Sequence, residues 1–550
     1  MPSSPTIFRS ILFLPLVIFP LLTYLFATNI TATIATFIKP EYQLASAGTF
    51  YPSFRDPRGF TYQLSWLSFF FLITSPLYLV PKRYLLRVLE LFSPSGPVIK
   101  SLSLLLVSTT GALYCFLASP PNAFPSNAAI HWVDGLLHPA YLSRYPLIGA
   151  IHSLFYDYPA ILMALLGATN CYLMYRVGKE LLSNQFHSVL MAMSFVLSAP
   201  MLIFANMAEG LHIVVCLTLL ASLFYLQRKL LPLVITIFLG VLARPQLLSL
   251  VGAIMMAEFA SSYAQERSLK RCISFTIRNS FLMRLCLWLG AAWIVYQGLT
   301  AIGGFNMFYQ VGEYNVMGYL NRRTATARAV AVDGKTISMF SGSYIIHFLW
   351  AFPWATTACS LYALVRSRLA NDIQYRFLVF ALTYVTINIV FHDLFPINYY
   401  NIRYLSYVYP TILLSSWLVM PIIAKQSLQF RLLVVGLLTF GPFFMWNSSL
   451  STKIFLEDHR LTPLVAARFE LRELQLSGDS AKLFTNLPAK QDKNFIAYVF
   501  KTPRSSIDVV KDISSVDGVF IFTGQVPDSC SNLHSYGEIS VCRIRHTAES

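Results

Sequence analysis

The stretch from Asn127 to Pro245 decides the fold, because polar and charged landmarks alternate in it with long apolar runs. It opens with a polar, helix-like segment, Asn127-Ala-Ala-Ile-His-Trp-Val-Asp-Gly-Leu-Leu. Apolar runs then close in turn at Tyr175-Arg-Val-Gly-Lys179, at Asn206-Met-Ala-Glu209 and at Gly240-Val-Leu-Ala-Arg-Pro245. Apolar runs of this length, bounded by charged residues, predict helices that cross a membrane.

The composition of the whole chain supports the same class. Of 550 residues, 56% are hydrophobic and 12% are charged, and the mean hydropathy is +0.57. A soluble domain carries about 25% charged residues, so most of this chain is expected to lie in lipid. The net charge of +16 would suggest a nucleic-acid partner on a soluble protein. On a membrane protein it fits basic loops at an anionic lipid surface, and no nucleic-acid partner is expected.

The apolar runs predict a polytopic, all-α membrane protein with about 13 transmembrane segments. Arg244-Pro245 interrupts one run, which we interpret as two half-length spans that meet near the outer surface, since proline breaks a helix and arginine avoids lipid. One set of alternate loops holds roughly twice as many Lys and Arg residues as the other, and we assign it to the cytoplasm. Loops 39–61, 119–157 and 302–342 and the tail then face outward. The runs are 10–38, 62–81, 99–118, 158–178, 186–205, 208–226, 231–258, 281–301, 343–365, 375–394, 403–424 and 430–448.

The chain beyond residue 449 has the composition of a small soluble domain. Residues 464–474 have helical spacing, 482–487 and 518–523 have the apolar character of buried strands, and 539–544 is predicted to be an edge strand. Cys530 and Cys542 are the cysteines of this tail and can form a disulfide if it is extracytoplasmic. We therefore expect an N-terminal two-span extension (1–97), a transmembrane core (98–449) and an extracytoplasmic α/β domain (450–550).

The order of these landmarks, with Ser143-Arg-Tyr-Pro-Leu147 after the first, resembles the GT-C superfamily of membrane glycosyltransferases, and its family 39 branch in particular. That branch contains the protein O-mannosyltransferases and the lipid A aminoarabinose transferases. The resemblance implies an inverting enzyme that takes a sugar from a polyprenyl-phosphate donor and transfers it to an extracytoplasmic lipid, glycan or protein acceptor. The chain departs from the family pattern where an acidic residue is usual, because Asn127-Ala128 fills that position.

Sugar transfer of this kind needs a base for the acceptor hydroxyl. If 127–138 is helical, His131, Asp134 and His138 share one face. Asp134 could act as the base, the three side chains could hold a divalent metal ion, or the face could simply be solvated. Glu209 opens a span on the outer side, where an ionisable group is usually functional, although the helix dipole alone would favour an anion there.

The phosphate of the donor needs cationic partners. Arg403-Tyr404 at the mouth of a late span resembles the arginine-tyrosine pair of many GT-C enzymes, and arginine binds phosphate through two parallel hydrogen bonds. Arg244 resembles the basic residue that follows a Gly/Leu-rich span in the family, with snorkelling to the lipid surface as the alternative. Arg322 and Arg323 lie in loop 302–342, which could be either a flap over the substrate or a segment that touches lipid headgroups.

Two other functions remain open at this level. A flippase or transporter of a lipid-linked saccharide predicts two repeats with matching broken helices, whereas one broken helix and no repeat is found. An inactive GT-C-like scaffold would explain Asn127. The sequence predicts no cofactor with certainty, and a divalent metal ion is the one candidate. A bacterial inner membrane is favoured as the location, and an endoplasmic reticulum membrane fits as well.

Overall fold

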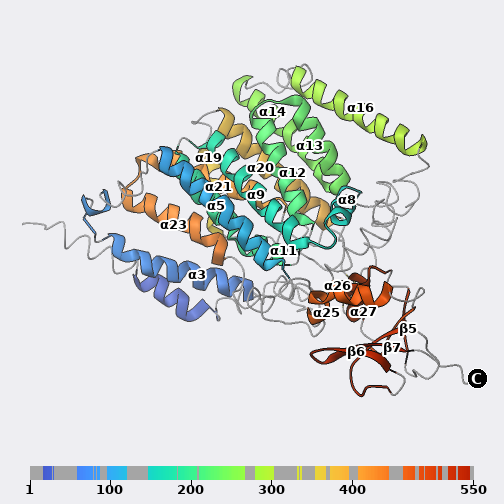
Figure 1. The fold of residues 1–550 in the computed structure, drawn as a ribbon. Helices are drawn as coiled ribbons and strands as arrows, with labels where there is room; N and C mark the ends of the chain where they lie inside the picture. Colours follow the sequence, from blue (N-terminus) through green and yellow to red (C-terminus); the bar gives the residue numbers. More distant parts are fainter. Residues whose placement is uncertain are drawn as a thin grey trace, which may run out of the picture.

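The computed structural model is mainly helical and ends in a small β-sheet (Figure 1). Five of the described helices are long and apolar enough to cross a membrane, namely Pro97–Leu117, Pro159–Leu181, Gln246–Ala264, Phe281–Gly298 and Ile373–Val390, which indicates a membrane protein. The structure describes residues 17–27, 29, 58–78, 80–81, 83–86, 96–119, 146–182, 184–206, 208, 210–266, 279–302, 331–332, 335–336, 354–366, 372–394, 407–444, 462–476, 482–487, 490–502, 506–510, 518–527 and 530–544.

The helices follow the apolar runs of the sequence. A first apolar helix, Val17–Ala27, is followed by α3 (Arg58–Thr74) with the 3-10 turn η2 (Ser75–Tyr78). The central bundle then contains α5 (Gly96–Leu117), α8 (Pro146–Leu154), α9 (Pro159–Leu181), α10 (Gln185–Val196), α11 (Ala199–Asn206), α12 (Leu211–Leu226), α13 (Leu230–Ala243), η3 (Pro245–Leu248), α14 (Ser249–Glu266), α16 (Ser280–Ile302), α19 (Trp354–Arg366), α20 (Asp372–Leu394), α21 (Tyr409–Trp417), α22 (Val419–Ile422), η6 (Ile423–Lys425) and α23 (Leu428–Phe444).

The bundle has two ends that can be told apart by contacts. The C-terminal domain lies at the end where α9 begins, which we call the domain end (Figure 1). At the opposite or distal end, Gln227 Nε2 donates to Glu180 Oε1 at 2.7 Å, and Gln374 Nε2 donates to the Leu181 carbonyl at 2.9 Å. Helices α9 and α12 therefore end at the distal end, and α20 begins there.

Close helix packing at the centre depends on a small residue. A Cβ at Gly167 of α9 would lie 2.5 Å from the ring of Tyr114 on α5, so only glycine fits there. The Tyr114 hydroxyl donates to the Val196 carbonyl at 2.9 Å, which satisfies its polar end inside the bundle. Small residues that let helices approach in this way are typical of membrane bundles, where apolar burial gives little drive for association.

Three predicted spans are more irregular than their sequence suggested. The run 186–205 is two helices, α10 and α11, and the run 403–424 becomes α21, α22 and η6 after Tyr409. The run 231–258 breaks after Ala243 as predicted, but its second part is not half-length, since Gln246–Ala264 is long enough to span. Pro200 lies in α11 and Pro421 in α22, and a proline cannot donate the helical hydrogen bond to the residue four positions earlier, so α10 ends at Val196 and α21 at Trp417.

The C-terminal domain contains α25 (Thr462–Ala466), α26 (Arg468–Leu476) and α27 (Lys490–Phe500) beside a five-stranded sheet. The strand order is β4-β3-β5-β7-β6, with parallel pairs on one side of β5 and antiparallel pairs on the other. This confirms the predicted sheet region, but the prediction that 539–544 is an edge strand was wrong, because β7 lies between β5 and β6. The strands are β3 (Lys482–Thr485), β4 (Ile507–Val509), β5 (Gly518–Phe522), β6 (Cys530–Tyr536) and β7 (Ile539–Ile544), and a separate antiparallel pair joins β1 (Ala331–Val332) to β2 (Lys335–Thr336).

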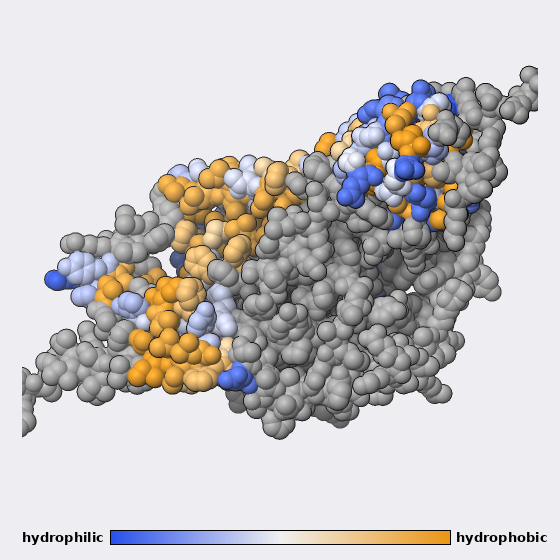
Figure 2. Space-filling view, turned by 90° about the horizontal axis from the view of Figure 1, so that it is seen from below, coloured by the Kyte–Doolittle hydropathy of each residue, from blue (hydrophilic) through white to orange (hydrophobic). Residues whose placement is uncertain are grey.

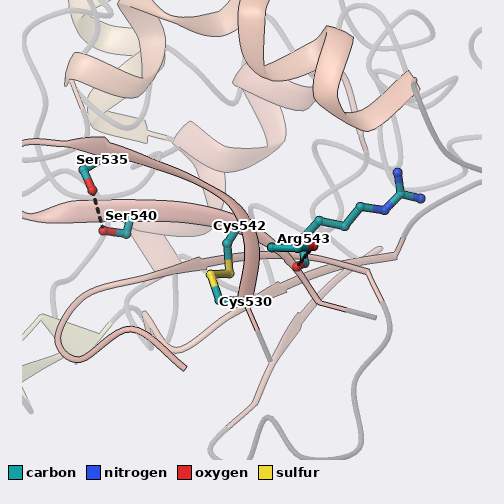
Figure 3. Close-up of a disulfide and its surroundings, with 6 residues drawn as sticks. Cys530, Ser535, Ser540, Cys542 and Arg543 are labelled. Atoms are coloured by element: carbon teal, nitrogen blue, oxygen red, sulfur yellow. Dashed lines mark hydrogen bonds between the residues drawn. A yellow bond between two sulfur atoms is a disulfide. The ribbon is translucent and has the colours of Figure 1, made fainter. Parts of the chain in front are cut away.

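Each face of the sheet carries its own apolar cluster, as alternation along a strand requires. Val519 and Ile521 of β5 belong to the core that includes the helices, while Phe520 and Phe522 join a second cluster. A disulfide between Cys530 and Cys542, with Cα atoms 5.6 Å apart, ties β6 to β7 (Figure 3). Seen from the domain end, this domain mixes hydrophilic and hydrophobic residues, whereas apolar residues dominate the described helices (Figure 2).

Candidate functional site

Arg244 lies where α13 stops and the chain turns into α14. Its backbone is extended, its N–H donates to the Gly240 carbonyl at 2.7 Å, and its own carbonyl accepts from Leu247 N at 3.0 Å. Pro245 has no N–H with which to continue α13, so the helix ends here. A Cβ at Gly240 would lie 2.8 Å from Leu247, which shows how tightly the returning chain packs. The half-buried Arg244 is thus held at a fixed helix break.

A buried polar network joins this break to the start of α21. Asn388 of α20 is 1% exposed, and its Nδ2 donates to the hydroxyl of Ser249, the first residue of α14, at 2.9 Å. Its Oδ1 accepts from the Tyr407 hydroxyl at 2.8 Å, just before α21. The amide therefore uses both of its ends to join two segments that are far apart in sequence. Ser249 follows Arg244 by five positions, and Tyr407 follows Arg403 by four.

Helix α8 covers the beginning of α12 on the same half of the bundle. The side chain of Ile148 lies so close to Gly210 that a Cβ there would be 2.7 Å away, and His152 of α8 is fully buried beside it. Helix α8 also packs on α13, whose end carries Arg244. Helix α8, which lies within the predicted outer loop 119–157, thus packs against the same helices as the Arg244 break.

Of the predicted site residues, Arg244 alone falls within the described ranges. Its half-buried position at the helix break fits a cation held near a turn of the chain. Among the residues that the structure describes, no group of three His, Cys, Asp or Glu side chains could hold a metal ion. The other predicted residues lie outside the described part: His131, Asp134, His138, Glu209, Arg322, Arg323, Arg403 and Tyr404.

A second polar centre, which the sequence did not indicate, joins the C-terminal domain to the bundle. Asp157, between α8 and α9, pairs with Arg472 of α26 through one carboxylate oxygen and with Lys501 through the other, at 2.7 Å. Burial alone would raise the pKa of the Asp157 carboxyl, but hydrogen bonds from Lys501 and Arg472, and their charges, lower it on balance. The carboxylate is therefore stabilised in its charged form.

The residues around Asp157 strengthen this contact. Tyr156 and Tyr498 exchange hydrogen bonds, each hydroxyl donating to the carbonyl of the other at 3.0 and 3.1 Å, and their rings stack 5.1 Å apart. Arg468 Nη2 donates to the Asp157 carbonyl at 2.7 Å. We call Tyr156, Asp157, Arg468, Arg472, Tyr498 and Lys501 together the junction. Its partners are more than 300 positions apart, so no local pattern in the sequence could have shown it.

These features define a helical membrane protein with a disulfide-bearing α/β domain fixed at one end of its bundle. Comparison with known proteins adds no family to this description: no family model matches the chain, and no curated protein is significantly similar to it.

Proposed function

We propose that this protein is a membrane glycosyltransferase that moves a sugar from a polyprenyl-phosphate donor to an extracytoplasmic acceptor. The observation that carries the proposal is the Asn388 network. The sequence predicts that Arg244 and Arg403 bind the donor phosphate. Ser249 follows the first by five residues and Tyr407 follows the second by four. Both hydroxyls are hydrogen-bonded to the Asn388 amide. A pair of arginines from such neighbouring segments would suit a phosphate that leaves with negative charge.

In the proposed reaction, Asp134 accepts the proton of the acceptor hydroxyl. The oxygen of that hydroxyl attacks the anomeric carbon of the sugar. The bond from that carbon to the phosphate oxygen breaks, and the polyprenyl phosphate leaves with the electron pair. Arg403 and Arg244, with Tyr404 and with Arg322 or Arg323 from loop 302–342, stabilise the phosphate, and Glu209 is the second candidate base. If a divalent metal takes part, His131, Asp134 and His138 are its proposed ligands.

In the proposed topology, the chain crosses the membrane about 13 times, by the length of the apolar runs. The domain end then lies on the extracytoplasmic side of a bacterial inner membrane or an endoplasmic reticulum membrane. Two observations support this orientation. The tail contains a disulfide, which persists in oxidising compartments. Asp157, at the end of loop 119–157, is bonded to that same domain, so loop and domain share one side.

Transfer from labelled polyprenyl-phosphate sugars in membranes tests the proposal. We expect Asp134→Asn and Arg244→Ala to lose about 100-fold or more of the rate, the usual scale for a general base or an electrostatic partner. Arg366→Ala, an arginine at the distal end of α19, is the control and should retain wild-type activity. Transfer that survives both substitutions would contradict the assignments, and no transfer from any donor would favour a transporter or an inactive scaffold.

A further inference from the structure

A buried carboxylate at the distal end of the bundle organises a group of cationic side chains that the proposed reaction does not use. Glu258 of α14 is 6% exposed, and its Oε1 accepts from the Tyr225 hydroxyl at 2.7 Å and from Arg228 Nη1 at 2.8 Å. Its Oε2 accepts from Asn279 Nδ2 at 3.3 Å. A charge buried in this way needs such partners, because its desolvation costs several kcal/mol.

Arg228 is held in one position by more than this ion pair. It has φ of 55°, a left-handed conformation that most residues avoid, directly after the end of α12. Its guanidinium lies over the ring of Tyr225, 5.4 Å from the centroid, and over that of Phe281 at 5.0 Å. These contacts fix the direction in which the guanidinium points, which is the preorganisation that a binding site needs.

A second guanidinium, from α20, faces the same carboxylate. Arg376 Nη1 is 3.9 Å from Glu258 Oε1, farther than the Nη1 of Arg228, and its side chain is 21% exposed. Together the two arginines line a recess at the surface of the bundle, while Glu258 is not among its lining residues. The recess is lined by Tyr225, Leu226, Arg228, Ile373 and Arg376.

With the helices crossing a membrane as proposed, the recess would lie at the level of the lipid headgroups. It lies at the end of α12 and the beginning of α20, where apolar helices give way to polar residues at the distal end. That end is also rich in described basic residues, so an anion there meets a favourable field. The described Lys and Arg residues of this end include Arg176, Lys179, Lys229, Arg366, Lys425 and Arg431.

We propose that this recess is a phosphate-binding site, separate from the domain end of the bundle. Guanidinium groups bind phosphate through their charge and their paired N–H donors, and two of them border this recess. Basic pockets between membrane helices bind the headgroups of anionic lipids, so a lipid phosphodiester is one source of the phosphate, and a soluble phosphate is the other. The site does not depend on the sugar-transfer reaction.

The test compares Arg376→Gln with Arg366→Gln in the purified full-length protein. After reconstitution in vesicles of phosphatidylcholine and phosphatidylglycerol, native mass spectrometry of the re-extracted protein measures retained phosphatidylglycerol. We expect wild type and Arg366→Gln to retain it, and Arg376→Gln to bind it about tenfold more weakly, as the loss of one charge-assisted contact implies. In a second arm, inorganic phosphate is added to the protein in phosphatidylcholine alone, and the melting temperature is measured.

The outcomes separate the two sources and can overturn the site. Retention of phosphatidylglycerol that depends on Arg376 assigns a lipid headgroup, whereas stabilisation by inorganic phosphate alone that depends on Arg376 assigns a soluble phosphate. If Arg376→Gln and Arg366→Gln behave alike with both probes, Arg376 is only a structural partner of Glu258 and the proposal fails. Should Arg376→Gln not fold, Arg376→Lys carries the same comparison, since it keeps the charge but loses the paired donors.

Discussion

At the scale of single residues, two polar side chains connect parts of the chain that sequence keeps apart. Asn388 lies inside an apolar run and Asp157 lies at the end of a long loop, and neither belongs to a recognisable motif. Their importance comes from partners brought by other helices. An unpaired polar group inside a bundle is costly, so each of them constrains the elements that satisfy it.

Replacing Asn388 by Leu should destabilise the bundle, because the hydroxyls of Ser249 and Tyr407 would lose the amide they share. We expect a loss of about 1–3 kcal/mol, since two buried hydrogen bonds are lost at about 0.5–1.5 kcal/mol each. Thermal unfolding followed by fluorescence-detected gel filtration measures it. Thr386→Val is the control on the same helix, since its exposed hydroxyl only bonds back to the Leu382 carbonyl. If the two variants were equally stable, the Asn388 hydrogen bonds would not contribute to the stability of the bundle.

The junction should weaken in acid because of Asp157. Its pKa is lowered from the ordinary 3.8 in the folded protein, so its contribution is complete above that ordinary value and is lost as the pH falls through the lowered value. Protease release of the C-terminal domain, by cleavage at a site inserted between residues 445 and 461, should therefore be slow at neutral pH. It should accelerate as the pH drops below about 4.

Asp157→Asn is the matched variant for this experiment. It should release the domain more readily at neutral pH and should lose the part of the pH response that belongs to the carboxylate. A wild-type release rate that is flat through the acid range, or a variant with the same acid response, would mean that Asp157 does not control the attachment.

At the scale of elements, helix packing in this bundle is set by small residues and by breaks. The break at Arg244-Pro245 could be predicted, because proline and arginine are visible in an apolar run. The breaks after Val196 and Trp417 lie four residues before Pro200 and Pro421, so the same proline signal was present there and was missed. The strands of the tail were predicted from their apolar runs, but the place of β7 inside the sheet was not, because strand order depends on tertiary contacts.

Enlarging Gly167 should separate α5 from α9. Gly167→Val places carbon atoms where the Tyr114 ring now lies, and overpacking of this kind costs about 1–3 kcal/mol. The midpoint of thermal unfolding in detergent measures the effect. Gly290→Val in α16 is the control, because a Cβ there would meet nothing within 4 Å. A Gly167 variant as stable as the control would show that the two helices adjust without cost.

At the scale of the whole molecule, the sequence predicted the division into a membrane part and a sheet-containing tail, but not how the two are joined. Composition distinguishes lipid-embedded from soluble segments, so the sequence alone reveals that division. The contact between Asp157 and Arg472 joins residues far apart in sequence, so only the structure reveals it. The predicted donor and base residues fall mostly outside the described ranges, so their assignment stays a prediction.

Charge reversal tests whether the junction is an ion pair that orients the domain. Asp157→Arg and Arg472→Asp should each increase protease release, and the double variant should recover part of the loss. The interaction energy between the two positions is expected to be about 0.5–3 kcal/mol from the double-mutant cycle. Glu473→Lys, on the exposed side of the same helix, controls for the change of charge. Strictly additive single effects would mean that the two side chains do not interact.

The separation in sequence within the junction has a consequence for biogenesis. Arg472 and Lys501 follow Asp157 by 315 and 344 positions, so ribosomes complete nearly the whole membrane part before these partners exist. During synthesis the Asp157 carboxylate therefore has neither of these two partners until the C-terminal domain has been made and has docked on the bundle. Chains truncated before Arg472 would insert into the membrane with this carboxylate still unneutralised by them, and quality-control proteases could recognise such chains as incompletely folded.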